Sequence, residues 1–372
     1  MPVIAVDAMG GDYAPGVVVE GARLALLEYG AEIVLVGQKE AVDAELGRYP
    51  DERSRLPVVS APQVVAMDES PSSAIRKKES SLKIAFEMMK RGEAQAVVSA
   101  GNSGAMMAIG MFVVGTLPQV ARPAILVVVP SVGKGVVIID AGANVDCKPR
   151  QLLQFGIMGA VYAEEVVGIP RPRVGVLSNG EEESKGNELT RAASELLAAS
   201  GLNYIGYVEG RDLFNGRVDV VVCDGFTGNV ALKTMEGLAG FAAGVLQGAF
   251  EKNLLSKIGY LLSRGPLREA YRRLDYAEYG GAPLLGLNGV AIVAHGGSSP
   301  RAIKNAIRVA GESVSHDVNR RIGEALARIM EGEKQEGQPP RATLWQKLKS
   351  KIENLGERAL DTAREKEKER GG

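Results

Sequence analysis

The sequence predicts an α/β protein with a doubly wound, mainly parallel, three-layer sheet and a helical insert. Short β-branched runs alternate with helical patterns along most of the chain, as in successive β-α-β units. Several of these runs are apolar throughout, which is typical of strands covered by helices on both faces. The expected strands are Val3–Asp7, Ile33–Val36, Val58–Ser60, Ala96–Ala100, Ile125–Val129, Val136–Asp140, Val174–Ser178, Asn203–Val208, Val218–Cys223 and Val290–Ala294.

Helical patterns fill the intervals between these strands. The expected helices include 81–91, 149–167, 184–200 and 299–330, with a helical insert over 228–274. Ser299-Pro300 marks one helix start, because serine is a favoured N-cap and proline suits the first helical position. We expect one catalytic domain over 1–330, a polar linker over 331–342 and an amphipathic helical tail over 343–372.

Composition narrows the class of protein. The chain has 372 residues, 45% of them hydrophobic, so it can bury a large core. Its net charge of −1 gives no general attraction to nucleic acid, and we expect no such partner. Two cysteines and two histidines are too few for a disulfide framework or a dedicated zinc site, so we expect no metal. We expect a cytoplasmic protein with no signal peptide.

Residues 94–121 carry no charged side chain, and a stretch of that length could span a bilayer. However, Gly101-Asn-Ser-Gly104 interrupts the stretch and Pro118 lies near its end. Irregular backbone exposed to lipid leaves polar groups without partners. We therefore predict a strand, a tight polar loop and a buried helix here, rather than a membrane span.

Polar residues and glycines gather directly after the predicted strands. Five such loops are Asp7–Asp12, Ser99–Gly104, Asp140–Lys148, Asp224–Asn229 and His295–Ser299. Ligands of open parallel sheets bind at the carboxyl ends of the strands, so we expect these loops to converge on one crevice. Where such loops enter helices, unpaired N–H groups suit a phosphate or an oxyanion. For any single loop, the alternative of a simple tight turn stays open.

Nucleotide-binding motifs are absent from these loops. No G-x-G-x-x-G follows a predicted strand, and Val132-Gly-Lys134-Gly lacks the upstream glycine and the hydroxyl residue of a P-loop. Lys185 lies at the start of a predicted helix, where a cation is unfavourably placed unless an anion is bound there. Neutralisation by Glu181–Glu183 is the alternative. Cys147 and Cys223 are expected to be small apolar fillers rather than nucleophiles.

The helical insert carries two surfaces that suggest partners. Gly237, Gly240, Gly244 and Gly248 share one helix face. Each interior glycine costs about 1 kcal/mol relative to alanine, which close approach of a second backbone would offset. We expect a helix–helix contact, and both a homodimer contact and a contact within the chain stay open.

The second surface is an apolar stripe beside a basic ridge. The stripe comprises Leu254, Leu255, Ile258, Leu261 and Leu262, and the ridge comprises Arg264, Arg268, Arg272 and Arg273. Between residues 252 and 274 there are six basic residues and one acidic residue, a local charge of +5. The stripe favours peripheral membrane contact, and the charge suits an acidic protein or anionic lipid. A solvated basic edge is the alternative. The apolar face of the tail is either a second membrane contact, a helical pairing element or a frayed end.

Several blocks in the same order resemble the phosphate acyltransferases of bacterial phospholipid synthesis, the PlsX family. They are IAVDAMGGDYAP, SAGNSGA, DAGANVDCKPRQLLQFGIMG, NGEEESKGNE, VEGRD, VVVCDGFTGNVALK, GGAPLLGLNG and HGGSS, and they run from residue 4 to about 310. The resemblance implies a fold similar to the isopropylmalate dehydrogenase and phosphotransacetylase group, a homodimer and no cofactor. It also implies that acyl-ACP (acyl carrier protein) and inorganic phosphate give acyl-phosphate, which feeds a membrane-bound glycerol-3-phosphate acyltransferase.

This chemistry requires no covalent enzyme nucleophile, because a thioester is already activated and phosphate is itself nucleophilic. The enzyme must align the phosphate and stabilise an oxyanion. We hypothesise that Lys185 and the Gly101–Gly104 loop hold phosphate, that Asn229 faces the oxyanion, and that Asp224 or His295 transfers a proton. A purely hydrogen-bonding role for His295 stays open. Further candidates for phosphate or substrate binding are Asp7, Gly10, Gly11, Asp12, Gly101, Asn102, Ser103, Gly104, Asn144, Asp146, Lys148, Asn187 and Thr227.

Three other functions compete with this one. An enzyme like phosphotransacetylase would use acyl-CoA in place of acyl-ACP. A decarboxylating dehydrogenase on the related fold would need a nucleotide fingerprint, which is not found. A non-catalytic membrane scaffold for lipid synthesis would have no use for five polar strand-end loops.

Overall fold

The computed structural model describes residues 2–274 and 280–335, with side chains for 2–269 and 280–330. In this part of the chain one 11-stranded sheet has the order β3-β2-β1-β4-β11-β10-β5-β6-β9-β7-β8. Its strands are β1 Val3–Asp7, β2 Glu32–Gly37, β3 Val58–Ser60, β4 Ala96–Ser99, β5 Ala124–Val129, β6 Val136–Ile139, β7 Val174–Leu177, β8 Tyr204–Val208, β9 Val220–Val222, β10 Ala282–Leu285 and β11 Val290–Val293. Every predicted strand is present within two residues of its predicted ends, and the predicted α/β class is confirmed.

Strand β10 was not predicted, and it joins two halves of the sheet whose strand direction reverses at the β5–β6 pair. It pairs antiparallel with both β11 and β5, and β5 pairs antiparallel with β6. The other pairs are parallel. As a result β6, β9, β7 and β8 run opposite to β1, β2, β3, β4 and β11. The five polar loops therefore do not follow strands that all point one way, and they form two groups.

Helices cover both faces of the sheet. Their bounds are α1 Gly16–Tyr29, α2 Lys39–Leu46, α3 Pro50–Arg53, α4 Pro71–Arg76, α5 Ser81–Lys90, α6 Ser103–Val113, α7 Pro149–Glu165, α8 Glu188–Ala199, α9 Asp212–Asn215, α10 Gly225–Glu251, α11 Leu254–Leu274, α13 Pro300–Ser315 and α14 Val318–Gln335. In the first half, α1 and α13 pack against one face of β1, β2, β4 and β11, while α5 and α6 pack against the other. In the second half, α7 packs against β6 and β9, and α8 against β7 and β8.

One predicted helix is divided in two. The pattern over 299–330 predicted a single helix, but α13 ends at Ser315 and α14 begins at Val318. Asp317 between them has a φ of 54°, a left-handed conformation that no α-helix continues through. The prediction of one helix was therefore wrong at this point, because the apolar period runs on through the break.

The uncharged stretch 94–121 folds as predicted into a strand, a loop and a helix. β4 is fully buried, and α6 buries residues such as Met106 and Ile109 against the sheet. Within the described part of the chain, no helix combines the length and apolar character that crossing a bilayer requires.

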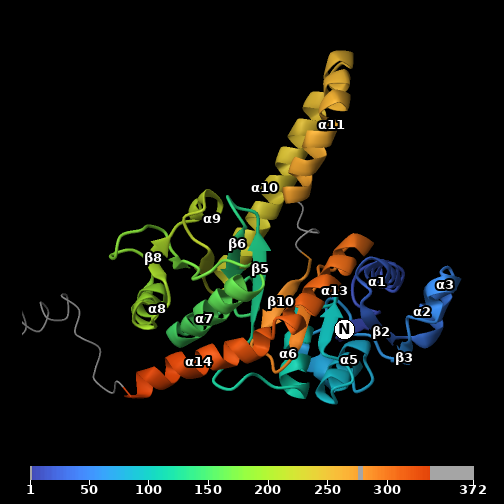
Figure 1. Ribbon diagram of the computed structural model, residues 1–372, viewed down its shortest axis with the longest axis horizontal. Coiled ribbons are helices and arrows are strands. Elements are labelled where there is room, and N and C mark those ends of the chain that lie inside the picture. Colours follow the sequence, from blue (N-terminus) through green and yellow to red (C-terminus); the bar gives the residue numbers. More distant parts are fainter. Residues whose placement is uncertain (1, 275–279, 336–372) are drawn as a thin grey trace, which may run out of the picture. The chain divides into compact units, whose positions relative to one another are not determined.

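The helical insert forms two long helices, α10 and α11, which contact each other and extend away from the sheet (Figure 1). The chain divides into two compact units, Met1–Ala327 and Arg328–Gly372. The predicted linker beyond residue 335 and the predicted tail over 343–372 lie outside the described residues.

Candidate functional site

The first group of loops is organised around Asp7, at the end of β1. Its carboxylate is buried and accepts hydrogen bonds from the Ser99 hydroxyl at 2.7 Å and from Met9 N at 3.2 Å. Ser99 Oγ in turn accepts a hydrogen bond from Gly101 N at 3.0 Å. A Cβ at Gly10 would lie 2.8 Å from atoms of three of these residues, so only glycine fits there. Burial raises the pKa of Asp7, and its hydrogen bonds offset part of that rise.

Asn102 caps α6 at the same edge of the sheet. Its Oδ1 accepts a hydrogen bond from Ala105 N at 2.9 Å, as expected of an N-cap. Its Nδ2 donates to Met67 O at 2.8 Å and to Glu69 O at 2.9 Å. The backbone N–H groups of Ser103 and Gly104 have no hydrogen-bond acceptor among the described residues. They are free to bind an anion at the positive end of the helix dipole.

The loop after β11 completes the first group. Asp12 N donates to Gly296 O at 2.9 Å, and a Cβ at Gly296 would lie 2.7 Å from Met67 Cε. The exposed ring of His295 accepts a hydrogen bond from Gly297 N at its Nδ1, at 3.1 Å. With Nδ1 acting as acceptor, the neutral ring carries its proton on Nε2. In this arrangement Nε2 can donate a hydrogen bond, which favours a hydrogen-bonding role for His295.

The second group is organised around Asp140, which follows β6. Its buried carboxylate accepts hydrogen bonds from four backbone N–H groups and from one side-chain amide. The backbone donors belong to Ile125, Gly142, Ala143 and Asn144, at 2.7 to 3.1 Å. The Asn144 amide donates to Asp140 at 2.8 Å and to Pro123 O at 2.7 Å. The buried Asn144 side chain thus holds the loop in place.

The first turn of α10 packs directly onto this loop. A Cβ at Gly228 would lie 2.0 Å from Asp140 O, so the two backbones are in contact. Asp224 caps α10 by accepting hydrogen bonds from Thr227 N at 2.9 Å and from Thr227 Oγ1 at 2.8 Å. Asn229 is exposed beside Gly142, and its amide makes no hydrogen bond to any other described residue.

Lys185 lies on the exposed loop after β7, a strand of the second half. Glu181 forms ion pairs with Arg217 and, at 3.6 Å, with Arg211. Within the described residues the Lys185 ammonium has no ion pair, so neutralisation by Glu181–Glu183 is not observed. Asn187 in the same loop caps α8 through Thr190 N at 2.9 Å.

Helix α6 connects the two groups of loops. Its N-terminus belongs to the first group, and its residues Ala105 and Met106 join an apolar cluster that also includes Ala141 of the second group. Ala143 and Leu232 pack against the same cluster. The loop after β6 and helix α10 therefore share one apolar cluster with α6. Lys185 and the Gly101–Gly104 loop, however, follow strands of opposite direction.

The predicted site residues differ in what their side chains do. Those of Asp7 and Asn144 are buried, and those of Asn102, Asn187 and Asp224 cap helices. Exposed side chains belong to Asp12, Ser103, Asp146, Lys148, Lys185, Thr227, Asn229 and His295. Ser99 and Asp140 open two of the predicted loops but were not chosen as site residues, although a polar residue at the end of a buried strand is a signal that could have identified them.

The described part of the chain contains neither a reactive thiolate nor a cluster of metal-binding side chains. Burial raises the pKa of Cys147 to about 12 and that of Cys223 well above its ordinary value, so both thiols are protonated at neutral pH. Among the described residues no group of three or more His, Cys, Asp or Glu side chains is placed to hold a metal ion.

The apolar stripe of α11 is exposed in the structure. Leu254, Leu255, Ile258, Leu261 and Leu262 are between 47% and 81% exposed. Arg264 and Arg268 are also exposed, whereas the side chains of Arg272 and Arg273 lie outside the described residues. On α10, a Cβ at Gly237, Gly240, Gly244 or Gly248 would lie within 4 Å of no described atom other than the nearby backbone of α10 itself. The glycine face is therefore not covered by any described part of this chain.

Comparison with known proteins agrees with the predicted family. A family described as "Fatty acid synthesis protein" matches residues 3–321. The phosphate acyltransferase of Syntrophotalea carbinolica is 56% identical over 321 residues, which are 86% of this chain and 92% of that protein. The phosphate acyltransferase of Citrifermentans bemidjiense is 55% identical over 334 residues, 90% of this chain and 95% of that protein.

Solved structures agree with the predicted fold. A phosphotransacetylase from Streptococcus pyogenes superimposes with a TM-score of 0.58 at 18% identity, covering 84% of this chain and 94% of that one. A branched-chain phosphotransacylase from Enterococcus faecalis gives a TM-score of 0.54 at 14% identity, covering 85% and 100%. The fold is thus that of the phosphotransacetylase group, and by sequence the chain belongs to the phosphate acyltransferase family, whose members are acyltransferases of fatty acid and phospholipid synthesis.

Proposed function

We propose that the protein transfers a long-chain acyl group from acyl-ACP to inorganic phosphate. The observation that carries the proposal is identity of 55 to 56% to proteins named phosphate acyltransferase, over 92 to 95% of their length. A phosphate oxygen forms a bond to the thioester carbon, and the carbonyl oxygen becomes an oxyanion. When the carbonyl re-forms, the C–S bond breaks, the carrier thiolate leaves, and acyl-phosphate remains. No covalent enzyme intermediate is needed, and the protonated state of both cysteines supports this route.

The geometry supports sites for both anions of the reaction. The free N–H groups of Ser103 and Gly104 suit phosphate, and the unpaired ammonium of Lys185 adds a cation in the second half of the molecule. The free amide of Asn229, beside the loop after β6, suits the developing oxyanion.

The direct test incubates the purified protein with palmitoyl-ACP and ³²P-labelled phosphate and measures labelled acyl-phosphate. A second arm replaces palmitoyl-ACP by palmitoyl-CoA. We expect turnover with the carrier thioester and much less with the CoA thioester. Turnover only with palmitoyl-CoA would instead favour an enzyme of the phosphotransacetylase type, and no product in either arm would refute acyl transfer to phosphate.

The role of Lys185 has its own test. Lys185→Ala should raise the KM for phosphate or lower kcat, with a loss of about tenfold or more in kcat/KM, because a cation facing a dianion is removed. Lys39→Ala is a matched control, since Lys39 is also an exposed lysine at the start of a helix that follows a strand. Unchanged kinetics in Lys185→Ala would remove this lysine from the site.

We further propose that the protein is a homodimer that contacts the inner membrane surface through α11, where its product passes to a membrane-bound glycerol-3-phosphate acyltransferase. The uncovered glycine face of α10 supports a partner helix, and the exposed apolar stripe of α11 with its basic flank supports contact with anionic lipid. The same basic flank also suits the acidic carrier protein.

A charge placed within the stripe tests the membrane contact. Ile258→Glu should release the protein from phosphatidylglycerol vesicles in a flotation assay, because the stripe would have to bury a carboxylate. Ser263→Glu introduces the same charge on the opposite side of α11 and should change binding far less. Equal binding by the wild type and Ile258→Glu would exclude membrane contact through this stripe.

A further inference from the structure

The segment between β3 and α5 forms a closed loop over residues 63–80, to which the proposed function assigns no role. The ends of the loop pair with each other, as Gln63 N donates to Glu79 O at 3.2 Å and Glu79 N donates to Gln63 Oε1 at 3.1 Å. Just beyond the loop, Ser81 N donates to Gln63 O at 3.1 Å. The side chain of Ser81 also hydrogen-bonds Asp7. The base of the loop is thus joined to the first group of strand-end loops.

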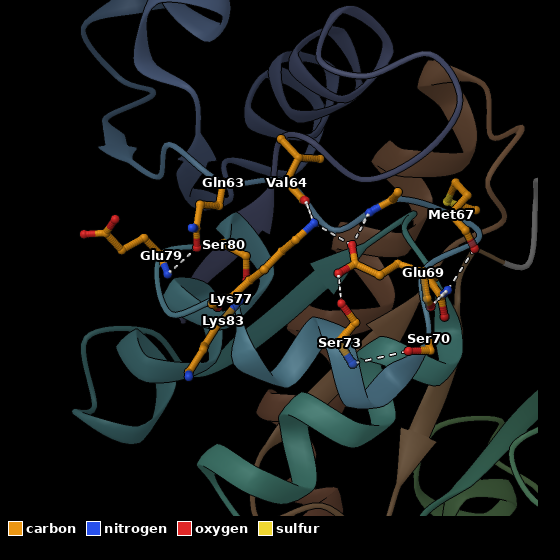
Figure 2. Close-up of polar contacts among 12 residues, drawn as sticks. Gln63, Val64, Met67, Glu69, Ser70, Ser73, Lys77, Glu79, Ser80 and Lys83 are labelled. Carbon is orange, nitrogen blue, oxygen red and sulfur yellow. Dashed lines mark hydrogen bonds and ion pairs between the residues drawn. The ribbon is translucent and has the colours of Figure 1, made fainter.

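An ion pair between Glu69 and Lys77 holds the interior of the loop together (Figure 2). Lys77 Nζ lies 2.5 Å from Glu69 Oε2 and donates to Val64 O at 2.7 Å. Glu69 also accepts hydrogen bonds from Ser73 Oγ at 2.8 Å and from Ala66 N at 3.2 Å. The Glu69 side chain is only 11% exposed, and its pKa is lowered chiefly by the hydrogen bond from Lys77.

The tip of the loop holds Asn102, the N-cap of α6. Both hydrogens of the Asn102 amide are donated to loop carbonyls, those of Met67 and Glu69. Glu69 is therefore fixed twice, by its carboxylate to Lys77 and by its carbonyl to Asn102. Pro71 of the same tip lies against the helix, since a Cβ at Gly104 would lie 3.4 Å from Pro71 Cγ. These contacts orient the Asn102 side chain, whose Oδ1 caps the helix.

We propose that Glu69 and Lys77 are positioning residues for the transfer of the acyl group to phosphate. The pair fixes the loop carbonyls that orient Asn102, and through Asn102 it fixes the direction of the Ser103 and Gly104 N–H groups. The inference rests on the proposed function, in which these N–H groups bind phosphate. Loss of the pair frees the tip of the loop, the cap rotates, and the donors no longer point together at one anion. Neither residue touches a substrate in this account.

A purely structural role of the loop predicts a different kinetic result. If the loop only stabilised the fold, losing the ion pair would reduce the fraction of active enzyme and leave the KM for phosphate unchanged. A positioning role instead raises the KM for phosphate and leaves the KM for acyl-ACP unchanged. The structural role and the positioning role are therefore distinguished by whether the KM for phosphate changes, and not by loss of activity alone.

The test compares Lys77→Met with Lys78→Met. Lys78 is exposed and makes no ion pair with any described residue, so it is a matched control at the adjacent position. We expect Lys77→Met to raise the KM for phosphate about tenfold, because misdirected donors lose most of their contribution to binding. The KM for acyl-ACP should stay within about twofold in both variants. A phosphate KM in Lys77→Met equal to that of the wild type would overturn the proposal.

A double-mutant cycle tests whether the pair acts through Asn102. Asn102→Ser keeps a residue that can cap the helix but removes the amide that contacts the loop. We expect Asn102→Ser alone to raise the KM for phosphate, and Lys77→Met to add nothing in that background, because the connection is already broken. If the phosphate KM of the double variant rose by the product of the two single increases, Lys77 would not act through Asn102.

Two measurements keep the proposal testable if a variant folds poorly or if the assay fails. Glu69→Gln removes the negative charge of the pair without changing the size of the side chain, and it should raise the phosphate KM as Lys77→Met does.

If the wild type forms no acyl-phosphate, the proposed function fails. Phosphate binding measured by calorimetry then compares the wild type with Lys77→Met and Lys78→Met. Weaker binding only in Lys77→Met would support the positioning role. Equal or undetectable binding in all three would overturn it.

Discussion

Asp7 and Asp140 hold equivalent places in the two halves of the molecule but are stabilised differently. Asp7 is the last residue of the strand VIAVD in the first half, Asp140 directly follows the strand VVII in the second, and each opens a polar loop. Burial raises the pKa of both, and hydrogen bonds offset part of the rise. Four of the five hydrogen bonds to Asp140 come from backbone N–H groups. Asp7 has one backbone donor, Met9 N, and depends otherwise on the hydroxyls of Ser99 and Ser81, which belong to other elements.

The difference lies in what the donors can do. A backbone N–H can only donate, whereas a serine hydroxyl can reverse its role and accept. The loop around Asp140 is therefore held mainly by backbone donors, while the loop around Asp7 is held also by side chains of β4 and α5. Backbone support is found where the loop contacts α10, and side-chain support is found at the edge where loop 63–80 meets α6.

The largest effect is expected at Asp140. Asp140→Asn places an amide opposite N–H groups that cannot accept, so buried donors lose their acceptor at a cost of about 3 kcal/mol in unfolding free energy. Urea unfolding measures this value. Asp146→Asn in the same loop is the control, since Asp146 is exposed, and it should cost less than about 0.5 kcal/mol. An equal loss of unfolding free energy in the two variants would show that the hydrogen bonds to Asp140 do not stabilise the fold.

An intermediate effect is expected at Ser99. Ser99→Ala removes the donor to Asp7 and the acceptor of Gly101 N–H, and we expect a loss of about 2 kcal/mol in unfolding free energy. Urea unfolding of Ser103→Ala, an exposed serine on α6, supplies the reference. A loss in Ser99→Ala no larger than in that variant would show that the hydroxyl does not link the two loops.

The smallest effect concerns pH and Asp7. Its native pKa lies above the ordinary value of 3.8, so the native state takes up this proton before the unfolded state as pH falls. The resulting stabilisation is complete below that value and is lost as pH rises through the native pKa. The wild type should therefore gain stability relative to Asp7→Asn as pH falls from about 7 to about 4. Urea midpoints at several pH values measure the difference, and a constant or opposite trend would contradict the raised pKa.

Much of the fold follows from residues close together in the chain. The ten predicted strands are present because β-branched apolar runs bounded by glycine and polar residues form strands largely on local grounds. The N-cap at Ser299 was also readable, and its hydroxyl accepts a hydrogen bond from Ala302 N at 3.3 Å. Strand β10 escaped prediction because it contains Pro283, and proline within a short run argues against a strand inside a sheet.

Residue pattern alone thus established the α/β class, the positions of most strands, the polar loops after them and the family. The three-dimensional arrangement decided the rest: that strand direction reverses at the β5–β6 pair, that loop 63–80 holds Asn102, and that Asp140 accepts five hydrogen bonds. The physical reason is separation along the chain. Strand and cap preferences depend on neighbouring residues, whereas strand direction and buried hydrogen bonds depend on partners that only folding brings together.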